Sequence, residues 1–315
     1  KLDPVAAHRS YRLCLVPRAH QLRLVQLQDI FQNLKVPGVV AEKLALLGLD
    51  GSNMDQRLLG AYAEREFVVQ YRETDLAFIS RLCEHLGIAF FFEHSNGLDQ
   101  MVFTDYEEGY PAIGAFDFRA DGDRRDVFTL EREAQVIPAM YVVHDYNYRT
   151  PTVELDAKTE ITSETARGGV IEYSPHAKTA EECQALSLVR SEERRGTEMV
   201  YHGESDRGAF FAGGRFVLHG HPLLDEPTLL LTEVVHRASQ PVLGQGGEST
   251  QTTYRNTFRA APSGFTYRPP RTTPWPRIQG LLTGIVEATV TGGTVTSTND
   301  SGIWVGYPGN LVQVM

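Results

Sequence analysis

Residues 70–94, QYRETDLAFISRLCEHLGIAFFFEH, contain the strongest fold signal in the chain. Apolar residues in the first half of this stretch recur at the i, i+3, i+7 and i+10 spacing of a buried helical stripe. Thr74 is suited to cap the start of a helix, and Gly87 can adopt the left-handed conformation that ends one. We therefore predict a helix over residues 74–86. Its stripe supplies four expected core residues: Leu76, Phe78, Ile79 and Leu82.

An unbroken apolar run follows the helix at residues 88–92 and is typical of a strand covered on both faces. A second short strand is expected before the helix, at residues 68–71, which gives a strand, helix, strand unit. Phe90 and Phe92 are predicted to lie in the core. A platform on which sugars or bases stack is the less favoured alternative, because consecutive residues of a strand point to opposite faces.

Working outward, most of the remaining elements are expected to be strands. Period-two or continuous apolar patterns predict strands at 11–16, 101–103, 141–143, 215–219 and 228–235. Helical periodicity with start and stop signals predicts helices at 37–47 and 179–196. The fold class is therefore mainly β with a few helices (α+β).

A proline-rich stretch, RPPRTTPWP, begins at Arg268. Its four prolines favour an extended and stiff backbone that lacks several hydrogen-bond donors. We predict a connector at 268–277 between a large domain at 1–267 and a smaller β-like segment at 278–315. The prolines expected to set its course are Pro269, Pro270, Pro274 and Pro276.

Composition excludes several classes of protein. The chain has 315 residues, 42% of them apolar and 22% charged, as folded proteins of two or three domains have. Its net charge of −10 disfavours nucleic acid and anionic membranes as partners. Three separated cysteines, Cys14, Cys83 and Cys183, form no C-x-x-C motif, which indicates a reducing compartment rather than a disulfide framework.

Few residues suggest catalysis. His219 and His221 form an H-x-H pair that Asp225, Glu226 or His236 could complete as a metal site, but this spacing fixes at most two ligands. We therefore expect no metal, no cofactor and no catalytic residue. Glu84 and His85, like the pair Glu192 and Glu193, are expected to be polar residues at element ends or on the solvated surface. The alternatives left open are a metal-dependent hydrolase using His219 and His221, and a β-rich carbohydrate-binding module.

Five segments in the same order resemble the VgrG family, the spike proteins of type VI secretion and related contractile injection machines. They cover most of the chain as far as about residue 291. The two most specific are the block at 65–94 and the block at 254–280. The segments read YRLCLVPR at 11–18, IFQNLKVPGVV at 30–40, REFVVQYRETDLAFISRLCEHLGIAFFFEH at 65–94, LLLTEVVHRASQP at 229–241 and YRNTFRAAPSGFTYRPPRTTPWPRIQG at 254–280.

The resemblance implies a phage tail-hub-like fold at 1–267, with two β-barrel subdomains and then the start of a small OB-type barrel at 278–315. It implies a structural function, in which a homotrimer caps the hexameric inner tube, contacts baseplate proteins, carries a spike-tip protein and effectors, and meets a membrane only transiently during puncture. It also implies assembly in the bacterial cytoplasm followed by ejection with the spike, or a place in a phage tail or an extracellular particle. The sequence departs from the family at KLDPVAAHRS, at its start, and after Val290.

Overall fold

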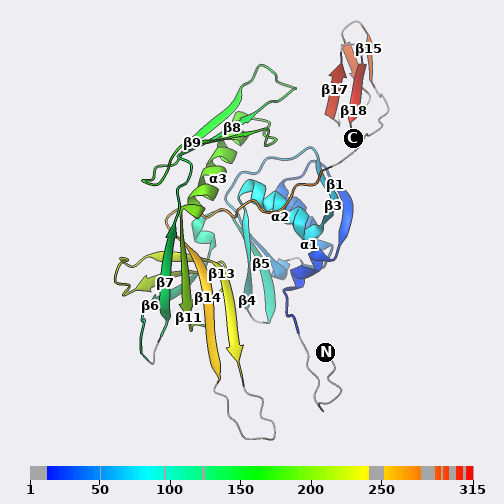
Figure 1. Cartoon of the computed structure of the whole chain (residues 1–315). Helices are drawn as coiled ribbons and strands as arrows, with labels where there is room; N and C mark the ends of the chain where they lie inside the picture. The colour runs from blue at the N-terminus through cyan, green and yellow to red at the C-terminus, as the bar shows by residue number, and fades with distance from the viewer. Residues whose placement is uncertain are drawn as a thin grey trace, which may run out of the picture.

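The computed structural model describes residues 13–49, 51–95, 97–122, 125–240 and 252–277, together with four short C-terminal strands (Figure 1). The predicted fold class, mainly β with a few helices, is confirmed. The described strands form separate sheets of two, three and six members. Three large apolar clusters hold most of the described chain together, and the first of them is shared by two of the sheets.

The strand, helix, strand unit predicted from residues 70–94 is present. The helix α2 (Asp75–Leu86) lies between β3 (Val68–Thr74) and β4 (Ala89–Ser95). The Thr74 hydroxyl accepts a hydrogen bond from the backbone N–H of Ala77 at 3.2 Å, which caps the first turn. Gly87 ends the helix with φ of +72°. A Cβ there would lie 2.8 Å from Cδ of Arg268, so glycine is needed for close packing as well.

The surroundings of α2 come from the N-terminal third of the chain. The 3-10 helix η1 (Arg18–Arg23) and the helix α1 (Val36–Ala45) share its apolar cluster. The neighbouring strands pair as β1 with β3, and as β2, β5 and β4 in that order. The remaining elements are β1 (Gln26–Phe31), η2 (Gly51–Asn53), β2 (Met54–Arg57), β5 (Leu98–Thr104) and η3 (Glu107–Gly109).

The six expected core residues all pack in this first cluster, but to different depths. Phe78 and Ile79 are fully buried and Leu82 is nearly so. Leu76, Phe90 and Phe92 are only partly buried and pack against the cluster. Phe90 thus lies at the edge of this core rather than at its centre. On the opposite face of β4, Phe91 is buried and stacks on Tyr110 with 5.6 Å between ring centroids.

The six-stranded sheet joins segments that are far apart in sequence (Figure 1). Its order is β6, β12, β13, β14, β11, β7, with β6 parallel to β12 and the other pairs antiparallel. Phe210, Phe216 and Phe258 form the centre of its core. The strands are β6 (Ala112–Asp117), β7 (Val127–Ala134), β11 (Met199–Ser205), β12 (Arg215–His219), β13 (Thr228–Ser239) and β14 (Thr253–Pro262).

The long helix α3 (Ala180–Glu198) packs on a three-stranded sheet of order β10, β8, β9. Its start is capped as the sequence predicts, since the Thr179 hydroxyl accepts from the backbone N–H of Glu182 at 3.2 Å. Cys183 and Leu186 face the sheet and are buried. The three strands are β8 (Met140–Asp145), β9 (Leu155–Glu160) and β10 (Val170–Tyr173).

The strand predicted at 11–16 is wrong where the structure describes it. Residues 13–17 have no regular secondary structure, and residues 11 and 12 lie outside the described part. Leu13 is 83% exposed and Leu15 is 95% exposed. A period-two pattern makes a strand only when a neighbouring strand pairs with it, and none of the described strands does so here.

The C-terminal segment contains two antiparallel hairpins. β15 (Ala288–Thr291) pairs with β16 (Thr294–Ser297), and β17 (Ile303–Tyr307) pairs with β18 (Asn310–Val314). These strands agree with the β-like character predicted for 278–315, while the OB-type barrel and the domain boundaries stay predictions. Among the described helices, none has the length and apolar character needed to cross a membrane.

Candidate assembly site

The predicted connector is closely packed against the helices. Residues 268–275, here called the strap, have no regular secondary structure and pass over α2 and α3. Pro269, Pro270 and Pro274 lie within it and Pro276 follows directly. Proline restricts the backbone to extended conformations. The strap therefore needs side-chain contacts to hold it, and these come from two arginines, two threonines and a tryptophan.

Arg268 joins α3 to the unit around α2. Its Nε donates to Oε2 of Glu192 at 2.7 Å. Its Nη1 donates to the carbonyl oxygens of Gly87 at 3.0 Å and Asp105 at 2.8 Å. Arg268 and Glu192 are 11% and 20% exposed, so this ion pair is shielded from water more than a surface pair is.

Arg271 binds two carboxylates at once. Its Nε donates to Oε2 of Glu193 at 3.1 Å, and its Nη1 donates to Oε1 of Glu172 at 2.8 Å. Glu172 also accepts from Nε of the fully buried Arg190 at 3.0 Å and from the Tyr141 hydroxyl at 2.6 Å. Burial alone would raise the pKa of Glu172, but Arg190, the Tyr141 hydroxyl and Arg271 outweigh it and hold that pKa below its usual value.

The far end of the strap is held by α2. Glu84 accepts from the backbone N–H groups of Thr272 at 3.0 Å and Thr273 at 2.9 Å. The Trp275 ring lies 5.6 Å from the ring of His85 and 5.9 Å from that of His176. The strap thus contacts α2, α3 and the sheet beneath α3, and it ties these elements together.

His85 lies under the strap and stays neutral. Its Nδ1 is 3.1 Å from Nη2 of Arg190, and its carbonyl accepts from Nη1 of Arg190 at 2.9 Å. Burial, reinforced by Arg190, lowers the pKa of His85 to about 3 from the ordinary 6.5. Because Arg190 can only donate, the neutral ring presents an acceptor at Nδ1.

This pKa predicts a pH dependence of stability. Between about pH 3 and pH 6.5 the unfolded chain binds a proton at His85 that the folded chain does not bind. We expect the free energy of unfolding to fall as the pH drops through this window, by at most about 1.4 kcal/mol per pH unit from this group. In urea titrations at several pH values across this window, His85→Gln should reduce the slope of the free energy of unfolding against pH. A slope equal to that of the parent chain would contradict the assignment.

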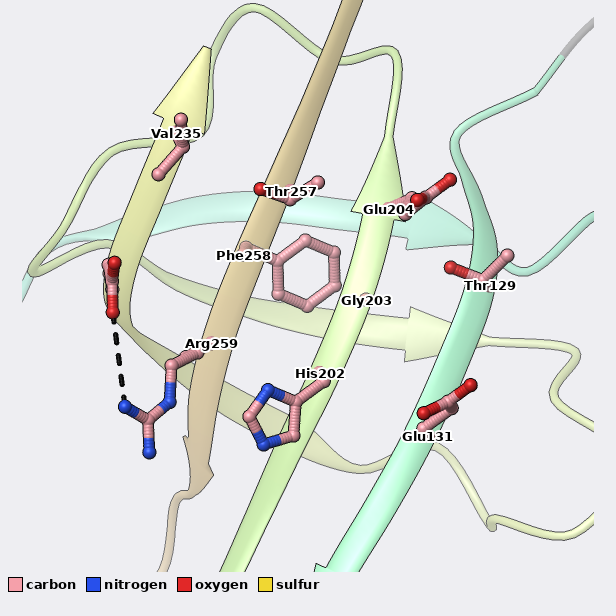
Figure 2. Close-up of a pocket in the computed structure, with 10 residues that line it drawn as sticks. Thr129, Glu131, His202, Gly203, Glu204, Val235, Thr257, Phe258 and Arg259 are labelled. Atoms are coloured by element: carbon pink, nitrogen blue, oxygen red, sulfur yellow. Dashed lines mark ion pairs between the residues drawn. The ribbon is translucent and has the colours of Figure 1, made fainter.

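A second candidate surface is the outer face of the six-stranded sheet (Figure 2). His202 and Glu204 project from β11, Glu131 from β7 and Arg259 from β14, around a shallow and mainly polar depression. Neighbouring charges on this face are paired. His202 Nε2 is 3.2 Å from Glu133 Oε2, and Arg259 is 3.9 Å from Glu233. An exposed polar face of this kind fits contact with another protein better than chemistry on a small molecule.

The H-x-H pair is not brought together as a metal site. Gly220 has φ of +71° and lies beyond the end of β12, so His221 falls in a turn. Nδ1 of His219 is 3.0 Å from Glu226 Oε1, whereas Nδ1 of His221 accepts from the backbone N–H of Leu223. Within the described part of the chain, no three His, Cys, Asp or Glu residues are grouped as metal ligands.

Sequence reasoning missed the polar residues that hold the strap. Glu192 and Glu193 were expected on the solvated surface, but each binds a strap arginine and Glu193 is buried. Glu84 and His85 were expected to be ordinary residues at the end of a helix. The signal that could have found them is the pair of arginines within the proline-rich stretch, because buried arginines require carboxylate partners.

A comparison with protein families decides which family this fold represents. The family described as Phage tail baseplate hub (GPD) matches residues 2–242. The chain belongs to this hub family.

Relatives of this hub chain include spike proteins. It is 30% identical over 294 residues to the type VI secretion system spike protein VgrG4b of Pseudomonas aeruginosa, covering 88% of this chain and 36% of that protein. It is 30% identical to VgrG5 of the same organism, with coverage of 88% and 37%. The actin cross-linking toxin VgrG1 of Vibrio cholerae is 26% identical, with coverage of 89% and 26%. The hub chain thus spans about a third of the first two relatives' lengths.

Solved structures agree on the fold. An Escherichia coli component of the type VI secretion system, itself similar in structure to T4 bacteriophage tail proteins, superposes with a TM-score of 0.57 at 21% identity. That alignment covers 88% of this chain and 61% of the other. A tail protein from Neisseria meningitidis gives a TM-score of 0.58 at 10% identity, covering 79% and 73%. The predicted tail-hub-like fold is therefore confirmed.

Proposed function

We propose that this chain is the hub of a contractile injection machine, placed between an inner tube and a spike. The observation that carries the proposal is the hub-family match over residues 2–242. Its relatives are named as spike proteins of type VI secretion systems, which supports the same kind of machine here. A hub works by binding its neighbours, so its chemistry is association.

The assembly proposed is a homotrimer that seats on the hexameric ring of the inner tube. Baseplate proteins surround it, and a spike-tip protein with effectors lies beyond it. It assembles in the bacterial cytoplasm, is ejected with the spike and meets a membrane only during puncture. Three copies of a hub with two similar subdomains present six similar faces, which a hexameric ring can match by closed symmetry.

We propose no enzymatic activity for this chain. The toxin relative from Vibrio cholerae is matched over only 26% of its length, so its named activity does not transfer to the present chain. Neither alternative, the hydrolase nor the carbohydrate-binding module, has a supporting observation among the described residues.

In this account the strap is the mechanical link to the spike. Arg268 and Arg271 bind Glu192, Glu193 and Glu172 of the hub. A load on the C-terminal side is then shared among these contacts and the backbone hydrogen bonds to Glu84. We propose that the mechanical unit of the hub extends through Trp275, which lies thirteen residues before the first C-terminal strand, β15, begins at Ala288.

Electron microscopy of tube ends tests the proposed function. Tubes assembled from the ring protein of the same machine are mixed with this chain and imaged by negative stain. We expect additional density at one end of each tube, because the hub caps the ring. Tubes whose ends look the same with and without the chain would contradict the proposal.

A further inference from the structure

The hairpin of β13 and β14 extends past the rest of the six-stranded sheet (Figure 1). β11 pairs with β14 only as far as the pair Ser205 and Asn256. The pairing between β13 and β14 continues to Ser239 and Thr253. We call the end of this hairpin, residues 235–239 with 253–257, the ribbon; from the pair Arg237 and Arg255 onward it has only two strands.

Cross-strand pairs on the outer face change character along the hairpin. Glu233 lies opposite Arg259, which is a favourable pair of opposite charges, and Val235 lies opposite Thr257. In the ribbon, however, Arg237 lies opposite Arg255. Like charges directly opposite each other destabilise a strand pair. This rung therefore weakens the isolated ribbon, and an anionic partner bound to it would offset the repulsion.

The two arginines are only partly neutralised. Nη2 of Arg255 is 3.1 Å from Oε1 of Glu204, and the Arg255 side chain is still 58% exposed. Arg237 is exposed and has no ion pair with any acidic residue that the structure describes. The outer face thus carries an excess of positive charge at the ribbon, although the chain as a whole has a net charge of −10.

The inner side of the ribbon is fixed in place. The Tyr254 hydroxyl lies 2.7 Å from Nδ1 of His236. Nδ2 of Asn256 donates to the Tyr254 hydroxyl at 3.1 Å and to the carbonyl of Arg207 at 2.9 Å. These bonds attach the ribbon to the turn after β11. Its arginine pair is therefore presented in a set position, which lowers the entropy cost of binding.

The position of the ribbon indicates whether it lies on the tube side or on the spike side of the hub. Thr253 lies in the ribbon and Pro262 ends the same strand about 30 Å away at the usual rise per residue. The strap follows Pro262 and leads toward the C-terminal segment. Resting on the proposed function, we place the strap on the spike side of the hub and the ribbon, at the other end of β14, on the tube side.

We propose that Arg237 and Arg255 form a docking site for carboxylates on the ring protein of the inner tube. Guanidinium groups pair with carboxylates through two parallel hydrogen bonds, which gives both strength and orientation. A protein carboxylate is favoured over nucleic acid or an anionic membrane, because the chain's overall negative charge repels extended polyanions.

Binding to purified rings of the tube protein tests this site, using the full chain on a biosensor at two salt concentrations. The double variant Arg237→Gln plus Arg255→Gln should bind about tenfold more weakly and with a smaller salt dependence. The matched control is Arg149→Gln, an exposed arginine outside this sheet that pairs with Glu66, which should bind as the parent chain does. Arg237→Gln alone should keep or raise the Tm, because it relieves the like-charge rung.

The outcomes separate the two proposals. Equal binding of the parent chain and the double variant would overturn the docking site while leaving the hub function standing. A parent chain that binds no ring would count against the hub function itself. Binding of the parent chain to heparin or to anionic phospholipid vesicles that the double variant loses, with ring binding unchanged, would assign the arginines to a polyanion and overturn the proposal.

Discussion

Truncating Phe78 to alanine should lower the free energy of unfolding by about 3 to 5 kcal/mol, as expected for removal of a large, fully buried aromatic side chain. Phe78 is 0% exposed. Its ring stacks on Phe31 with 5.6 Å between centroids, and the guanidinium of Arg81 lies 5.0 Å from its centroid. The buried ammonium of Lys43 lies 5.9 Å away. The change therefore opens a cavity and also removes an aromatic face from two cations.

Chemical denaturation of Phe78→Ala beside Phe67→Ala measures this effect. Phe67 is the matched control, because it is the same residue type and is 43% exposed. Phe90→Ala should give an intermediate loss, since Phe90 only packs against the cluster from its edge. Equal losses for Phe78 and Phe67 would contradict the placement of α2 at the centre of the core.

Replacing Glu172 with glutamine should lower the free energy of unfolding by about 3 kcal/mol, the second large effect that we expect. This is the lower end of the range for breaking a buried ion pair, because Glu172 is still 20% exposed. The carboxylate of Glu172 lies between Arg190 and Arg271, at 3.0 Å and 2.8 Å. Without it, two guanidinium groups remain close together, and Arg190 is fully buried with no ion pair to another acid among the described residues.

The relative stability of two single variants tests whether Glu172 is the acid that neutralises Arg190. Arg190→Met removes the buried cation and fills its space with an apolar side chain, while Glu172 keeps its contacts with Arg271 and Tyr141. We therefore expect Arg190→Met to be less destabilising than Glu172→Gln in urea unfolding. The reverse order would show that Glu172 is not the acid that neutralises the junction below the strap.

Local signals in the sequence predict local elements well in this chain. The boundaries of α2 follow from the cap at Thr74 and the left-handed turn at Gly87, and the start of α3 follows from the cap at Thr179. In each case one side chain or one backbone conformation acts within a few residues. The period-two pattern at 11–16 failed because a strand depends on a partner that the pattern itself does not specify.

The arrangement of the sheets and the strap could not be predicted from such signals. β6 pairs with β12, and β7 pairs with β11, across long stretches of intervening chain. Alternating apolar residues indicate that a strand has a buried face, but they do not indicate its neighbour. In the same way, the prolines of 268–277 predict an extended backbone, whereas its attachment depends on acids more than seventy residues away.

The mass of the assembled protein tests most directly whether this chain forms a trimeric hub. Multi-angle light scattering coupled to size-exclusion chromatography should give three times the chain mass of 35.1 kDa, about 105 kDa, across a micromolar range of concentrations. A single species of 35.1 kDa throughout that range would contradict the trimer.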